Sequence, residues 1–93
     1  MITFDRTANP RKVLAEVLTA RLSAHDKHGD NSIESIDPLD PRWLSILVEE
    51  VGEVAHELTY DSTGDLRAEL IDVMSVVSAW IDALDRRAGV FQH

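Results

Sequence analysis

Residues 47–54 read LVEEVGEV and residues 66–73 read LRAELIDV, and the architecture of the chain follows from these two stretches. In both, apolar residues recur every three or four positions, which is the spacing of an amphipathic helix. Acidic residues three positions apart border the apolar ones, so each helix presents a pair of carboxylates on one face. Antiparallel packing of the two apolar seams brings the pairs together. The pattern predicts a helical hairpin with four carboxylates in one place.

The two acidic groups, residues 49–53 and 69–72, need a counter-charge if they meet, because like charges at this separation repel and raise one another's pKa. A solvated helix face is the simpler explanation for any single acid. Such a face usually mixes signs, however, and residues 49–57 contain four Glu and no Lys or Arg. Hard divalent cations take carboxylate oxygens as ligands. We therefore expect bound Mg²⁺, with Mn²⁺ as a substitute.

The composition excludes several classes of protein. The chain has 93 residues, of which 44% are hydrophobic, and it fits one small globular domain over residues 1–93. A formal charge of -8, with 9 basic against 17 acidic residues, argues against binding to duplex nucleic acid. The sequence has no cysteine, which excludes disulfides and thiolate metal sites. It has neither a signal pattern nor an apolar run near the ~20 residues of a membrane span, so we expect a cytoplasmic protein without membrane contact.

Capping signals divide the chain into three helices and one long connection. With their caps, the predicted helices cover about residues 9–29, 40–60 and 65–88. Asn9 and Asp40 are the predicted N-caps. The predicted core side of the hairpin consists of Leu44, Leu47, Val51, Val54, Leu58, Leu66, Leu70, Val73, Met74, Val77, Trp80, Ile81 and Leu84. A chain this short buries only roughly 60–65% of its unfolded surface, so we expect it to self-associate.

Together the two stretches resemble the MazG-like branch of the all-α nucleoside triphosphate pyrophosphohydrolases, whose signature is Glu-Glu-x-x-Glu followed on the next helix by Glu-x-x-Asp. The resemblance covers roughly residues 43–87. It implies an all-α fold that assembles as a homodimer or homotetramer with a site in a helical bundle. The implied activity is Mg²⁺-dependent hydrolysis of a nucleoside or deoxynucleoside triphosphate to monophosphate and pyrophosphate, in house-cleaning or control of the nucleotide pool.

The resemblance also assigns roles to single residues. The implied metal ligands are Glu50, Glu53, Glu69 and Asp72. The implied catalytic residues are Glu49, Glu50 and Glu53, with Glu49 either supporting a metal ligand without binding the metal itself or orienting the attacking water.

The positions of several residues along the chain suggest which of them contact the substrate. Trp43 lies on the same helix edge as Glu50, two turns earlier, and is predicted either to stack on the base or to fill the core or an interface. Residues 25–29, HDKHG, are either the polar end of the first helix or a nucleotide-contacting lid in which Lys27 binds substrate. Larger family members carry phosphate-binding residues on a further C-terminal helix. Here the candidates are Lys27, Arg67, Arg86 and Arg87, or residues of a partner copy.

Two other kinds of protein remain possible from the sequence. A di-iron carboxylate bundle needs Glu-x-x-His on two helices, but this chain has it once, at residues 53–56, with Asp72 where the second His would be needed. A non-catalytic helical dimer could keep the acids as a structural cation site and act as a regulatory or protein-binding module, because a fold does not prove turnover.

Overall fold

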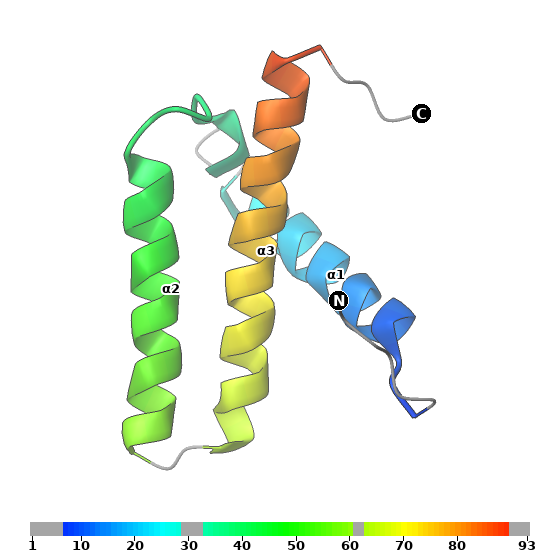
Figure 1. Ribbon diagram of the computed structural model, residues 1–93, viewed down its shortest axis with the longest axis vertical. Coiled ribbons are helices and arrows are strands. Elements are labelled where there is room, and N and C mark those ends of the chain that lie inside the picture. The colour runs from blue at the N-terminus through cyan, green and yellow to red at the C-terminus, as the bar shows by residue number, and fades with distance from the viewer. Residues whose placement is uncertain (1–6, 29–32, 61–62, 90–93) are drawn as a thin grey trace.

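The computed structural model describes residues 7–28, 33–60 and 63–89, which form three α-helices and one short 3-10 helix (Figure 1). The α-helices are α1 (Pro10–His28), α2 (Arg42–Thr59) and α3 (Thr63–Arg87), and the 3-10 helix is η2 (Ile33–Ser35). The described residues contain no strand, which confirms the predicted all-α class. None of the described helices has the length and apolar character needed to cross a membrane.

The helix ends agree with the predicted bounds to within two residues, although the N-cap of α2 is Pro41 and not the predicted Asp40. The Asn9 side chain accepts a hydrogen bond from the backbone N–H of Lys12 at 3.2 Å. The Asp40 side chain accepts one from the N–H of Arg42 at 2.9 Å, at the start of α2. Beyond the end of α3, Gly89 has a φ of 80° and its N–H donates to the carbonyl of Arg86 at 3.1 Å. A positive φ of this kind is adopted most easily by glycine.

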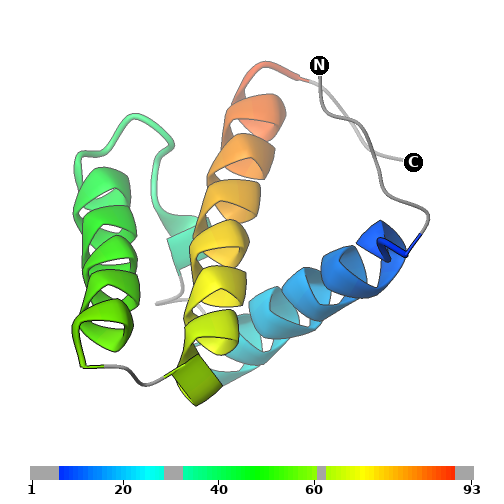
Figure 2. The same cartoon turned by 60° about the horizontal axis from the view of Figure 1, so that its bottom comes forward.

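Helix α3 is the centre of the molecule, because it contacts α2 on one side and α1 on the other. Helices α2 and α3 form the predicted antiparallel hairpin, and α1 crosses α3 at an angle (Figure 1 and Figure 2). Where α3 meets the start of α2, the buried core consists of Trp43, Ala79 and Ala83. The partly buried Ile36, Val76 and Trp80 pack against it.

Trp43 is fully buried, with 0% of its surface exposed, and its ring stacks on that of Trp80 at a centroid distance of 5.8 Å. Its indole N–H donates to the carbonyls of Ile36 and Asp37 at 3.3 and 3.1 Å. The indole N–H of Trp80 donates to the carbonyl of Pro38 at 2.7 Å. The prediction that Trp43 stacks on a substrate base is therefore wrong in this chain, because both faces and the polar edge of the ring are used by the core.

Arg21 joins α1 to the rest of the fold. Its guanidinium donates to the Ser78 hydroxyl at 2.8 Å and to the Asp82 carboxylate at 2.6 Å, both on α3. It also forms an ion pair with Glu34 of η2. One mostly buried cation therefore connects three elements, and hydrogen bonds to charged groups are among the stronger ones in proteins.

Much of the predicted core side of the hairpin is exposed, which corrects that expectation. Leu44, Val51 and Leu58 of α2 are 50–62% exposed. On α3, exposure is 37–53% for Leu70, Met74, Val77, Ile81 and Leu84. The reason is geometric, since the apolar sector of each helix is wider than the strip that one neighbouring helix covers.

Candidate metal centre

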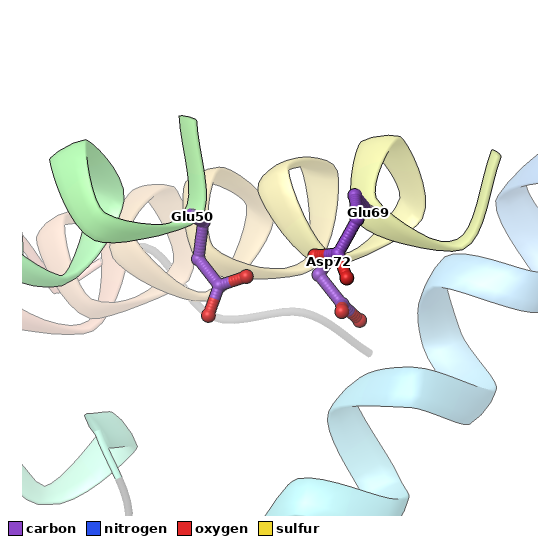
Figure 3. A group of neighbouring side chains, drawn as sticks. All are labelled: Glu50, Glu69 and Asp72. Atoms are coloured by element: carbon purple, nitrogen blue, oxygen red, sulfur yellow. The ribbon is translucent and has the colours of Figure 1, made fainter. Parts of the chain in front are cut away.

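Three carboxylates meet where α2 and α3 run side by side. Glu50 comes from α2, and Glu69 and Asp72 come from α3. One oxygen of each lies within 4.8 Å of one oxygen of each of the others. Their side chains leave the hairpin on the same side (Figure 3). The antiparallel hairpin thus brings the two acidic pairs together, as the helical spacing predicts.

Glu53, the fourth predicted ligand, lies beside this group. It shares a hydrogen bond with Glu69, and its charge acts on Glu50, Glu69 and Asp72. Glu49 is one residue from Glu50, and its charge also acts on Glu50. All five predicted acids therefore belong to one electrostatic unit, which we call the acid cluster: Glu49, Glu50, Glu53, Glu69 and Asp72.

The surroundings of the acid cluster raise the pKa values of three of its carboxyl groups. The hydrogen bond with Glu53, followed by burial and the neighbouring charges, raises the pKa of Glu69 to about 7. Burial, with the charges of Glu53, Asp72 and Glu49, raises the pKa of Glu50. Burial and the charge of Glu53 raise the pKa of Asp72. Such shifts are typical of carboxylates that share a site without a counter-charge.

The donor set suits a hard divalent cation. The Oε2 atoms of Glu50 and Glu69 are buried and have no hydrogen-bond partner among the described residues. Buried polar atoms are normally paired, so these oxygens have unused capacity for a ligand. Mg²⁺ binds oxygens at about 2.1 Å, and three carboxylate oxygens within 4.8 Å of one another are close enough for side-chain rotation to bring them onto one cation. The residues present fit the metal.

Residues 41–91 match the family model of the MazG nucleotide pyrophosphohydrolase domain, which is more than half of the 93 residues. The chain belongs to this MazG family. The matched range includes α2, α3 and the whole acid cluster, and it begins after α1. Comparisons with curated proteins and with solved structures gave no match. MazG membership confirms the resemblance seen in the two sequence stretches, whereas the role of each acid stays a prediction.

The predicted phosphate-binding arginines lie away from the MazG acid cluster. Arg67 pairs with Glu16 of α1 and projects from α3 about 200° around the helix axis from Glu69. Arg86 lies about 21 Å along α3 from Asp72 and donates to the Glu34 carbonyl at 3.4 Å. Arg87 pairs with Asp37 at 3.4 Å. Phosphate binding by these residues is untested, and for Arg86 it requires a second copy of the chain.

Lys27 lies in the last turn of α1, which agrees with the first alternative, that residues 25–29 are the polar end of the first helix. Its side chain is outside the part of the chain that the structure describes, as is Gly29, so the lid prediction stays untested. The di-iron alternative gains no support, because the described group of possible metal ligands contains no histidine. His56 of the single Glu-x-x-His motif packs against Tyr60 instead.

This ring pair was not predicted from the sequence. His56 lies on α2 beyond the acidic motif, and Tyr60 is the residue that caps the C-terminal end of α2. The available signal was their spacing, because His56 and Tyr60 continue the stripe that Glu49 and Glu53 begin.

Proposed function

We propose that this MazG-family chain is an active enzyme that hydrolyses a nucleoside or deoxynucleoside triphosphate to the monophosphate and pyrophosphate, with Mg²⁺ held by the acid cluster. The observation that supports this most directly is the convergence of Glu50, Glu69 and Asp72 from two helices, with unpaired buried oxygens on the two glutamates. The raised pKa values of Glu50, Glu69 and Asp72 also support it, because carboxyl groups with perturbed pKa values cluster at functional sites. House-cleaning or control of the nucleotide pool is the corresponding cellular role.

The residues divide the work by position. Glu50, Glu69 and Asp72 hold the cation, and Glu53 orients the Glu69 carboxylate through their shared hydrogen bond. When bound, a divalent cation neutralises phosphate charge and lowers the pKa of a coordinated water. Glu49, at the edge of the cluster, is placed to accept the proton of the attacking water.

The proposed reaction needs no covalent enzyme intermediate. The oxygen of water forms a new bond to phosphorus, and the P–O bond between the α- and β-phosphates breaks. Pyrophosphate leaves with the bonding electron pair, and the proton lost by water passes to a carboxylate. The protein contributes positioning and electrostatic stabilisation, which dominate catalysis of phosphoryl transfer.

A panel of nucleoside triphosphates, with pyrophosphate release as the readout, tests this function. We expect Mg²⁺-dependent release by the wild type. Glu50→Gln and Asp72→Asn should each lower kcat by at least about a hundred-fold, because removal of one electrostatic partner of a transition state typically lowers kcat by about 10²–10³. Asp85→Asn is the matched control, since it removes the same charge from α3 outside the cluster.

The result that contradicts the proposal is full turnover by Asp72→Asn or in excess chelator. Metal binding by the wild type without pyrophosphate release from any nucleotide would instead favour the non-catalytic cation-binding dimer.

A further inference from the structure

Tyr60 and His56 form an exposed pair of rings at the C-terminal end of α2. Their centroids are 4.5 Å apart and the ring planes are tilted by 48°. Tyr60 is 67% exposed, which is unusual for a side chain with so much apolar area. His56 is also exposed. The pair therefore presents aromatic surface to solvent at a fixed place on the helix.

The rings share a helix face with part of the acid cluster. Glu49, Glu53 and His56 of α2 and Tyr60, the residue that caps it, follow one another at intervals of four, three and four residues. Side chains at these intervals lie above one another on one face of a helix. Since Glu53 is hydrogen-bonded to Glu69, this stripe runs directly from the acid cluster to the ring pair. At about 1.5 Å per residue, Tyr60 lies about 10 Å beyond Glu53 along the helix axis.

The two tryptophans are used elsewhere in the fold. Trp43 and Trp80 stack on each other, and both indole N–H groups are bonded to the backbone of residues 36–38. Among the side chains whose exposure the structure describes, His56 and Tyr60 are therefore the aromatic rings that a ligand can reach over a whole face. A base needs such a face to stack on.

We propose that Tyr60, supported by His56, is the surface on which the base of the bound nucleotide stacks. This inference rests on the proposed function, because it takes the phosphates to be held at the acid cluster. The sugar and base of a nucleotide then extend along α2 toward its C-terminal end. Every base can stack on an aromatic ring, so stacking discriminates little between bases. We therefore expect this surface to favour nucleotides over phosphates that lack a base, without selecting one particular base.

The ring pair stays accessible if the apolar faces of the hairpin are covered. Leu58 precedes Tyr60 by two residues and so projects about 200° around the helix axis from it. The exposed apolar stripe that includes Leu58 is therefore on the opposite side of α2. A second copy packed on that stripe leaves Tyr60 open.

Steady-state kinetics with a nucleoside triphosphate, paired with inhibition by Mg²⁺-pyrophosphate as a base-free probe, tests the proposal. We expect Tyr60→Ala and Tyr60→Leu to raise KM by about ten- to a hundred-fold with a smaller change in kcat. Tyr60→Phe should stay near the wild-type KM, because it keeps the ring. Inhibition by pyrophosphate should be the same in all variants. Thr59→Ala, at the neighbouring exposed position, is the control and should change neither quantity.

Tyr60→Leu keeps apolar bulk, so it separates loss of stacking from loss of folding, and thermal melts check that each variant is folded. The proposal is overturned if Tyr60→Ala and Tyr60→Leu leave KM unchanged, or if inhibition by pyrophosphate weakens equally, while the wild type hydrolyses nucleotides. If the wild type hydrolyses none, calorimetric binding of a nucleoside triphosphate replaces KM. If binding then depends on Tyr60, the stacking proposal holds and the proposed catalytic activity is refuted. If no nucleotide binds, both the stacking proposal and the proposed activity are refuted.

Discussion

Glu69 is the member of the acid cluster whose hydrogen bond with Glu53 favours its protonated form, and it gives stability a measurable pH dependence. Its pKa is raised in the folded protein from 4.5 to about 7. A carboxyl with a raised folded-state pKa binds its proton more tightly when folded, so acid favours the folded state. Without metal, we expect the free energy of unfolding to fall as pH rises from about 4.5 to about 7.

Urea titrations over this pH range, in chelator and in Mg²⁺, measure the effect. Glu69→Gln should flatten the pH dependence and raise the melting temperature at pH 8 in chelator, while losing stabilisation by Mg²⁺. A change of 1 kcal/mol in the free energy of unfolding corresponds to a change of about 4–8 °C in the melting temperature of a domain of this size. Asp85→Asn should keep the wild-type profile. A wild-type profile that rises with pH over the same range would contradict this reading of the cluster.

Trp43 is predicted to determine stability and not base recognition. Because its buried ring stacks on Trp80, Trp43→Ala should lower the free energy of unfolding by about 3–5 kcal/mol, the usual loss for a large aromatic in a core. Trp43→Phe should be milder, since it keeps a ring in the same place. Denaturant melts followed by tryptophan fluorescence give both values. A stable Trp43→Ala protein with a selectively raised KM would show that the ring reaches substrate after all.

At the scale of elements, α1 depends on one side chain for much of its attachment to α3 and η2. Replacing Arg21 by leucine removes the cation that pairs with Asp82 and Glu34. We expect the free energy of unfolding to fall by about 1–3 kcal/mol, the usual contribution of hydrogen bonds to charged groups. Arg67→Leu is the control, because the Arg67–Glu16 pair is more exposed and should contribute at most about 1 kcal/mol.

Hydrogen exchange checks the same prediction locally. In Arg21→Leu, the amides of α1 should lose protection while those of α2 and α3 keep most of theirs. Equal losses in the two arginine variants would mean that the ionic contacts of Arg21 do not hold α1 in place.

The extent to which the sequence predicts these elements depends on the range of the interactions involved. Helix ends were predictable because caps such as Asn9 and Gly89 act within a few residues. The meeting of Glu50 with Glu69 and Asp72 was predictable because helical spacing and a hairpin suffice for it. The positions of Trp43 and Arg21 were not, since helical periodicity shows that a side chain borders a seam but not which element covers it.

At the scale of the whole molecule, one chain exposes more surface than its mass warrants. The total is 7215 Å², including residues outside the described ranges, against roughly 5,400 Å² expected for a folded monomer of 10.4 kDa. Obligate dimers bury on the order of 1,000–2,500 Å² per partner. The exposed apolar residues follow helical spacing on both arms of the hairpin: Leu44, Val48, Val51 and Leu58 on α2, and Leu70, Met74, Val77, Ile81 and Leu84 on α3.

We propose that a second copy covers this hairpin face and completes a helical bundle, giving a homodimer or, with further contacts, a homotetramer. Ile81→Asp should dissociate it, because a charge buried in an apolar interface is strongly unfavourable, while Leu39→Asp, at an exposed site outside the helices, should not. Light scattering at micromolar concentration measures the mass. A wild-type protein that runs as a stable monomer of 10.4 kDa would contradict the proposal.

The central claim is that the acid cluster directs cleavage between the α- and β-phosphates of a nucleotide. Phosphorus NMR of a nucleoside triphosphate incubated with the protein and Mg²⁺ tests it most directly, because each product has its own signal. We predict equal amounts of monophosphate and pyrophosphate, with neither signal formed by Asp72→Asn. Formation of diphosphate and orthophosphate, or an unchanged triphosphate spectrum across the nucleotide panel, would contradict the claim.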